Sequence, residues 1–413
     1  MNDRRRLKLT TAYLFAFMAS FALSSTMFST VLPKMIEDFH LSLSMAGLLP
    51  MCTSVGNLIA MALTGLVGDR TRKSVYVGLI SAAMGVMLLA VSPASSFAML
   101  LAALLLLGVC TSSLNLMLTA YVSDIYGERR SRYINLLHVC FGIGSLVGPL
   151  YPTALGAADL SWRFAYMMLA VVVLILSAAY FLTLRRLGAP ASFADANASA
   201  APKEAGGAMG LLRSSSVWVL GIVSFLYMGG HQNAFSTWFQ THLQQANAAL
   251  YPESLTSACM TIYWIGMVIS RLIGSALPQK FSSRSIILTA SLVGVCALSG
   301  GLAIDAPAGW VVSVSLLGIA TGVIYPLTFA ISCAWFPSNS ALVSSIVGVF
   351  SSLGSILFGY LMGFMEELYP SVALWLPVAA LLSVFVIVLL FMKNPQTTDI
   401  PKTPERTEPS FQK

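Results

Sequence analysis

Arg271 is the one basic residue deep within a long apolar stretch of the sequence. A buried charge is costly unless it faces protein or a water-filled cavity and finds a partner. Arg271 could bind an anionic or polyhydroxylated ligand, or form a structural ion pair or a contact with backbone carbonyls. The neighbouring apolar stretches offer no evident carboxylate to pair with it. The sequence leaves both roles open.

A second group of chemically capable side chains lies in the stretch 214–238. Tyr227, His231 and Trp238 recur at helical spacing and share one face, with Gln232 and Asn233 beside the histidine. Aromatic rings can stack on a sugar, and imidazole changes charge near neutral pH. We favour a site that binds solute or carries a proton over a neutral His231 satisfied by a neighbouring helix.

Asn115 is another polar residue in apolar surroundings, with Thr111 and Thr119 on the same helical face. Such side chains often hydrogen-bond between membrane helices. Contact with a solute is the interpretation we prefer.

The stretch 133–152 combines a histidine with small residues. His138 there is more typical of a helix-packing hydrogen bond than of a coupling residue. Gly144, Gly148 and Pro149 predict close helix approach and a kink. A related pattern marks drug antiporters, but by itself this one predicts packing only.

The amino-acid composition indicates which kind of helix positions these residues. Of 413 residues, 57% are hydrophobic and 9% are charged, whereas about a quarter are charged in ordinary soluble domains. A membrane-spanning helix needs about 20 apolar residues, so the length accommodates twelve. The expected spans are 9–32, 44–67, 74–91, 97–120, 133–152, 163–184, 214–238, 256–277, 285–304, 309–335, 340–364 and 371–392.

This pattern divides the chain into four parts. We expect a six-helix bundle at 1–184, a cytoplasmic linker at 185–213, a second bundle at 214–392 and a disordered cytoplasmic tail at 393–413. With the N-terminus placed inside, all but three of the 23 Lys and Arg residues fall in cytoplasmic segments or termini. The three exceptions are Lys34, Arg163 and Arg271. This asymmetry predicts that both termini are cytoplasmic.

Several function classes are disfavoured. The net charge of +7 is dispersed over short loops, which gives no basis for nucleic-acid binding. The six cysteines lie in apolar runs without CxxC spacing, so we expect neither a metal site nor a cofactor. No paired carboxylates or triad partners are found, so an enzyme is not expected.

The segment after the second span resembles a known loop signature. Gly65-x-x-x-Asp69-Arg70, followed by Arg72-Lys73, is similar to the loop motif of the major facilitator superfamily. The resemblance implies an all-α membrane protein with twelve transmembrane helices in two pseudo-symmetric six-helix bundles. It also implies that Gly65, Asp69 and Arg70 form an inner gate, in which Asp69 contacts the N-terminus of the eleventh span.

Three further segments, 135–149, 227–238 and 264–274, resemble the fucose permease-like branch, the fucose–galactose–glucose:proton symporters. The last of these contributes Trp264 as a further solute contact. Where relatives often carry a carboxylate in the seventh span, this chain has His231.

These observations predict a monomeric transporter in a lipid bilayer, the bacterial inner membrane, that moves a small sugar-like solute with a proton. The alternatives are proton-antiport efflux of a hydrophobic or amphipathic compound and a non-transporting membrane receptor. The receptor gains nothing from the gating loop, and the chain has no sizeable domain through which it could signal.

Overall fold

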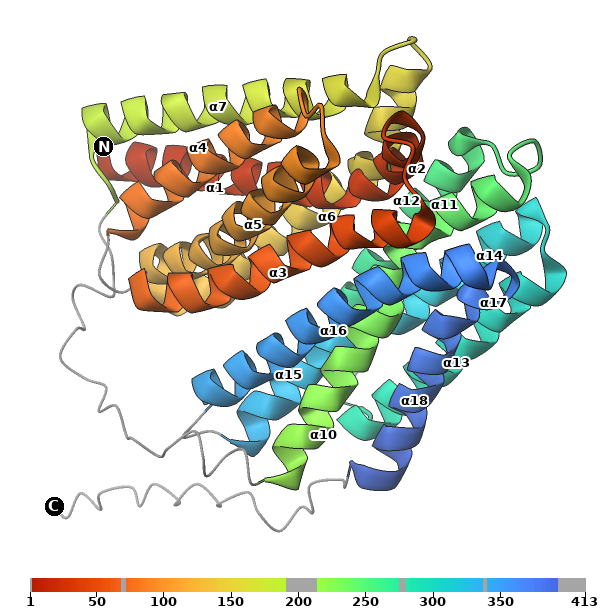
Figure 1. Cartoon of the computed structure of the whole chain (residues 1–413). Coiled ribbons are helices and arrows are strands. Elements are labelled where there is room, and N and C mark those ends of the chain that lie inside the picture. The colour runs from red at the N-terminus through yellow and green to blue at the C-terminus, as the bar shows by residue number, and fades with distance from the viewer. Residues whose placement is uncertain (1, 68–71, 191–213, 275–279, 337–339, 393–413) are drawn as a thin grey trace, which may run out of the picture.

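A computed structural model describes residues 2–67, 72–190, 214–274, 280–336 and 340–392. Every regular element among these residues is a helix (Figure 1). The first half of the chain consists of α1 (Asn2–Thr26), α2 (Phe28–Asp38), α3 (Leu43–Val67), α4 (Lys73–Val91), α5 (Phe97–Tyr126), η1 (Gly127–Arg129), α6 (Arg130–Gly156) and α7 (Trp162–Leu187).

The second half repeats this plan. It consists of α10 (Ser215–Ser224), η2 (Phe225–Asn233), α11 (Ala234–Asn247), α12 (Glu253–Gly274), α13 (Ser283–Ile304), α14 (Pro307–Thr321), α15 (Ile324–Trp335), α16 (Ser340–Leu368), α17 (Pro370–Ala373) and α18 (Trp375–Phe391). Within the halves, α1 packs on α6 and α3 on α5, and α12 packs on α14 and α16 on η2. Between the halves, α3 meets α16, α6 meets α12 and α2 meets α11.

Eleven helical stretches of the described chain are long and apolar enough to cross a membrane. The consecutive elements α10, η2 and α11 supply the twelfth, which is interrupted by a change of helix type and extends to Asn247. This completes the expected arrangement of twelve helices in two bundles.

Some boundaries differ from those expected. The span placed at 9–32 is two helices, because α1 ends at Thr26 and α2, which contains Pro33, begins at Phe28. The span at 309–335 is likewise divided between α14 and α15. Residues 185–187 of the expected linker continue α7, whereas 191–213 and the tail at 393–413 lie outside the described residues.

Glycine allows the closest helix contacts. A Cβ atom added to Gly229 in η2 would lie 2.1 Å from the carbonyl carbon of Gly354 in α16. The two backbones can meet there only because neither residue has a side chain, as is common between membrane helices.

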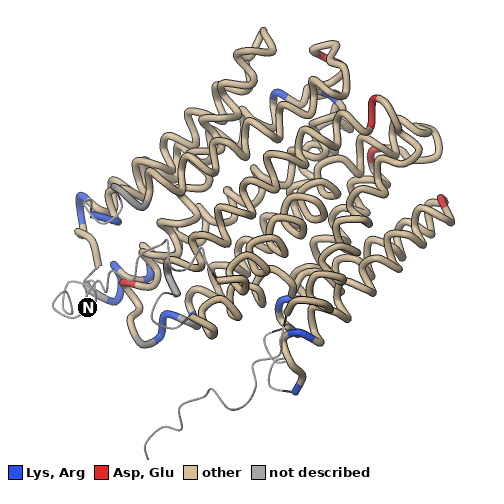
Figure 2. Tube along the Cα trace, turned by 60° about the horizontal axis from the view of Figure 1, so that its bottom comes forward, with Lys and Arg blue, Asp and Glu red and all other residues tan. Residues whose placement is uncertain are grey.

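Charge is divided between the two ends of the molecule. Figure 2 shows Lys and Arg gathered at the end that holds the N-terminus, here called the basic end, and Asp and Glu mostly at the opposite end. The two exceptional basic residues at the opposite end are both paired. Arg163 lies 2.8 Å from Asp38, and Lys34 lies 2.8 Å from Glu253. Because these two residues are paired with carboxylates, the excess of positive charge among the described residues lies at the basic end.

Candidate functional site

Arg271 lies in the last turn of α12, closer to the helix end than the sequence suggested. Side chains on a helix lean toward its N-terminus, and Arg271 interacts electrostatically with three tyrosines, Tyr227, Tyr263 and Tyr325. Its Nε atom is buried without a partner, and the guanidinium forms no hydrogen bond or ion pair within the described chain. The structural ion pair considered as an alternative is not formed there.

The tyrosines around Arg271 provide hydroxyl groups and no net charge. The Tyr227 hydroxyl donates a hydrogen bond to the carbonyl oxygen of Thr321 at 2.6 Å. The Tyr263 hydroxyl is buried and makes no hydrogen bond of good geometry. The guanidinium is therefore surrounded by neutral polar groups from three helical segments, η2, α12 and α15.

His138 approaches Arg271 from the first half of the chain. Helices α6 and α12 run antiparallel across the boundary: Thr153 hydrogen-bonds Ser257 at 2.7 Å, and Thr261 donates to the carbonyl of Leu146 at 3.2 Å. Continued along α6 and α12, this register brings His138 level with Arg271.

In agreement with this register, the side chains of His138 and Arg271 are close enough to interact electrostatically. His138 is exposed and forms no hydrogen bond within the described residues, so the packing bond expected for it is not formed. The structure instead places His138 and Arg271 on opposite sides of the boundary between the halves.

His231 lies in an aromatic column on the segment α10–η2–α11. Its ring centroid is 5.7 Å from that of Tyr227 and 6.2 Å from that of Phe235, and Phe235 continues to Phe239 at 5.0 Å. The imidazole is fully buried, and neither ring nitrogen has a hydrogen-bond partner. The alternative considered for His231, a hydrogen bond to a neighbouring helix, is not formed among the described residues.

A π-helix underlies this arrangement. Residues Phe225–Asn233 form η2, which contains the consecutive glycines Gly229 and Gly230. π-helical turns are rare, and they occur frequently at functional sites. Sequence spacing identified the shared face of Tyr227 and His231, but it predicted an ordinary α-helix.

Of the other expected solute contacts on these helices, Gln232, Trp238 and Trp264 are buried and Asn233 is half-buried. Gln232 Oε1 and Trp238 Nε1 have no hydrogen-bond partner, whereas Asn233 Nδ2 donates to Ser355 Oγ of α16. Trp264 packs edge-on against Tyr263, with ring centroids 5.4 Å apart. Asn233 is thus already engaged, and the remaining polar atoms are free.

Asn115 in α5 also has a buried side-chain oxygen without a partner. The hydroxyls of Thr111 and Thr119 donate to carbonyls of their own helix, at Leu107 and Asn115 respectively. The hydrogen bonds between helices that were considered for this face are not formed by the two threonines.

Comparison with known proteins identifies the family. The family model described as Major Facilitator Superfamily matches residues 13–307 and 249–412. The chain belongs to the major facilitator superfamily. Members of this superfamily are transporters and not enzymes, so this protein is an integral membrane transporter with a small-molecule substrate.

Solved structures support the fold of this transporter. It is similar to a crystallised mutant of the nucleoside transporter NupG, with a TM-score of 0.77, 14% identity, and coverage of 93% of this chain and 100% of the other. It is also similar to a bacterial homologue of the human lysosomal transporter Spinster in an inward-facing, unoccupied conformation. The TM-score there is 0.70 at 14% identity, with coverage of 92% and 94%. No curated protein sequence matches the chain.

Of the three residues predicted to form the inner gate, only Gly65 lies in the described part of the chain. Gly65 belongs to the last turns of α3. Asp69 and Arg70 lie outside the described residues, so the inner gate stays a prediction.

Gly144 and Gly148 of α6 lie against α1, and Pro149 of α6 lies against α2. A Cβ added to Gly144 would lie 2.2 Å from the carbonyl oxygen of Ala19. The carbonyl of Pro149 accepts a hydrogen bond from Thr30 at 3.0 Å. Helix packing stays the predicted role of these three residues.

Sequence reasoning missed a buried acidic group in the transporter. Glu366 of α16 is 3% exposed, and both of its carboxylate oxygens lie 2.9 Å from Nδ1 of His242 in α11. The expected eleventh span ended at 364 and so excluded Glu366, whereas α16 continues to Leu368. An acidic residue directly after an apolar run, with a histidine on another span, was the available signal.

The opposite end of the transporter is held closed by contacts between the halves. Besides Lys34 and Glu253, Glu367 accepts a hydrogen bond from the backbone N–H of Ser44 at the start of α3, at 2.7 Å. Gln240 of α11 donates to Thr30 of α2 at 2.8 Å.

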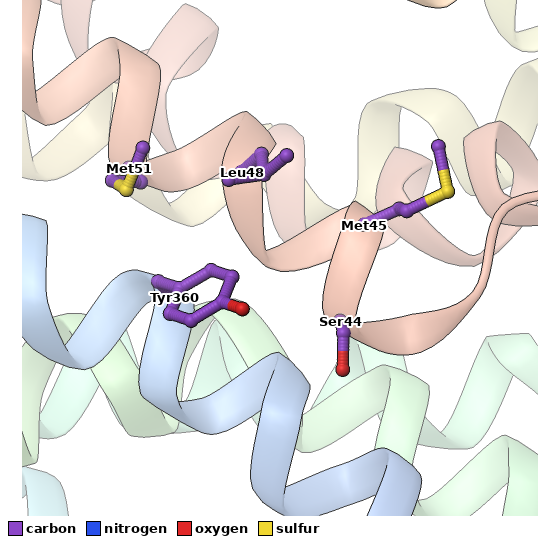
Figure 3. A pocket seen from close by; sticks show the side chains of 5 residues that line it. All are labelled: Ser44, Met45, Leu48, Met51 and Tyr360. Atoms are coloured by element: carbon purple, nitrogen blue, oxygen red, sulfur yellow. The ribbon is translucent and has the colours of Figure 1, made fainter.

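A pocket of about 310 Å³ lies near the same end, between α3 and α16. Figure 3 shows Tyr360 of α16 facing Leu48 and Met51 of α3, with Met45 and Ser44 beyond them. Its lining is largely apolar and without charge, so it does not offer the polar partners found around Arg271.

Proposed function

We propose that this transporter is a secondary active carrier of a small polar solute, a sugar or sugar-like compound, that works by proton-coupled alternating access. The observation that carries the proposal is the concentration of buried, unpartnered polar atoms in one part of the second half. They belong to Ser224, His231, Gln232, Trp238, Thr241, Tyr263 and Arg271.

Buried polar groups nearly always have hydrogen-bond partners. A solute rich in hydroxyl groups supplies both donors and acceptors, which suits unpartnered atoms of both kinds, such as the Gln232 oxygen and the Trp238 nitrogen. The column of Tyr227, His231 and Phe235 adds rings of the kind that pack against a sugar. The resemblance to the fucose permease-like branch supports the same substrate class.

His231 is the proposed proton carrier. It is the histidine at the centre of the polar segment, and neither of its ring nitrogens has a hydrogen-bond partner among the described residues, so a solute that enters the site would find both available.

Uptake into proteoliposomes tests both parts of the proposal. We expect a pH gradient to drive accumulation of at least one compound from a panel of fucose, galactose, glucose and the corresponding sugar acids. His231→Ala should lower gradient-driven uptake at least about tenfold, the usual minimum for loss of a proton-transfer group. His40→Ala, which removes an exposed histidine at the opposite end, is the matched control.

Each outcome has a separate meaning. Full gradient-driven uptake by His231→Ala would eliminate the coupling role of His231 while leaving sugar transport intact. Stabilisation and export of amphipathic drugs, without uptake of any polar solute, would replace the proposal with proton-antiport efflux.

We also propose that the basic end is cytoplasmic in a bacterial inner membrane. Excess Lys and Arg on one side is the usual determinant of orientation. A green fluorescent protein fused to the C-terminus should fluoresce, and an alkaline phosphatase fused there should be inactive. The reverse pattern would invert the orientation.

A further inference from the structure

The strongest unassigned feature is the unpaired charge of Arg271, and its interpretation rests on the transport function proposed above. The Arg271 side chain is half-buried with its Nε atom fully enclosed, and no carboxylate of the described residues lies within ion-pairing distance of it. The charged and titratable groups with which it interacts are three neutral phenols and His138.

The polar groups near Arg271 suit an anionic ligand, because they can donate hydrogen bonds and carry no negative charge. Neutral phenols can donate hydrogen bonds, but they do not compensate a positive charge. The Tyr227 proton is already committed to Thr321, whereas the Tyr263 hydroxyl is available. A guanidinium binds a carboxylate through two parallel hydrogen bonds. A neutral solute leaves the charge uncompensated.

The position of His138 adds a second donor from the other half of the molecule. The antiparallel register of α6 and α12, fixed by Thr153 with Ser257 and Leu146 with Thr261, brings His138 to the level of Arg271. At this level the boundary between the halves has basic groups on both sides and no described acidic residue.

We propose that the transported solute carries a carboxylate, as a sugar acid does, and that Arg271 binds this group while His138 contacts it from across the boundary. One anion then bridges the two halves. An anion accepts hydrogen bonds from both side chains, so its binding favours bringing α6 and α12 together at the basic end. Neutral sugars cannot perform this step.

The test compares solutes that differ only in the acidic group. Galacturonate with galactose, and glucuronate with glucose, are suitable pairs. We measure binding to the detergent-purified full chain by calorimetry, and uptake into proteoliposomes. The acid of at least one pair should bind at least about tenfold more tightly than the neutral sugar, as expected for a charge-assisted hydrogen bond.

Variants locate the effect. Arg271→Gln should weaken binding of the acid by about 10- to 100-fold and leave binding of the neutral sugar little changed. His138→Ala should cause a smaller loss. Arg132→Gln, which removes an exposed arginine from the basic end of α6, is the matched control and should bind normally. Because the preference for the acid is measured first on the unmodified protein, the test does not depend on the folding of any variant.

Three results would overturn the inference. The first is equal or tighter binding of the neutral sugars, which would leave the proposed sugar transport standing. The second is binding of the acids that Arg271→Gln does not weaken. The third is that liposomes with phosphatidylglycerol abolish acid uptake seen with phosphatidylcholine alone, which would assign Arg271 to a lipid phosphate. Failure of every polar solute, acidic or neutral, to bind or move would instead remove the proposed function itself.

Discussion

Single residues in this transporter differ in how far the sequence reveals them. Arg271 and His231 are visible because a charged or titratable side chain is rare in an apolar stretch. The partner of Glu366 is not visible, because the contact between α16 and α11 joins residues 124 positions apart. Sequence can therefore identify an unusual side chain inside a membrane helix, but not the group that it faces.

The contact between Glu366 and His242 should be important for stability. Removing one partner of a buried hydrogen bond leaves the other polar group unsatisfied, which costs about 1–3 kcal/mol in soluble proteins. Glu366→Ala should therefore lower the midpoint of thermal unfolding in detergent by several degrees. Glu37→Ala, which truncates an exposed glutamate, should leave the midpoint unchanged. Equal midpoints for both variants would show that the pair contributes no stability.

At the scale of the elements, apolar length and charge placement predicted most helices to within a few residues. The exceptions are local. A break at Met27 divides the first span, and a π-helix occupies Phe225–Asn233. Neither could be predicted, because their cause lies in tertiary packing. The close approach of Gly229 to Gly354 involves two segments far apart in sequence.

That approach gives a prediction for the element. Gly229→Ala places a Cβ 2.1 Å from the backbone of Gly354, so η2 or α16 must shift. Overpacking of this kind costs about 1–3 kcal/mol, and we expect a lower unfolding midpoint with reduced solute binding. Gly300→Ala in α13 is the control, because a Cβ there meets no atom within 4 Å. If the two variants unfold at the same temperature, the backbone contact is not a constraint.

At the scale of the whole molecule, the arrangement of contacts describes one state of the transport cycle. The ion pair of Lys34 with Glu253, the bond from Ser44 to Glu367 and the bond from Gln240 to Thr30 all join the halves at the end opposite the basic one. Solute can enter from that end only when these contacts separate. The sequence indicated two halves, but it gave no indication of which residues close this end.

A crosslink at that end should stop transport. The hydroxyls of Thr153 and Ser257 lie 2.7 Å apart across the halves, so cysteines in their place are near enough to form a disulfide. In a background without the native cysteines, oxidation of the double variant Thr153→Cys with Ser257→Cys should abolish uptake, and reduction should restore it. Each single variant is the control. Undiminished uptake by the oxidised double variant would show that the halves need not separate there.

The two consecutive glutamates at the end of α16 have a mechanical consequence. Glu366 contacts His242 within its own half, and Glu367 contacts the start of α3 in the other half. Because both side chains belong to one helical turn, a rotation of α16 that releases Glu367 also displaces Glu366 from the histidine. We therefore expect opening of the molecule at this end to free a buried carboxylate as well.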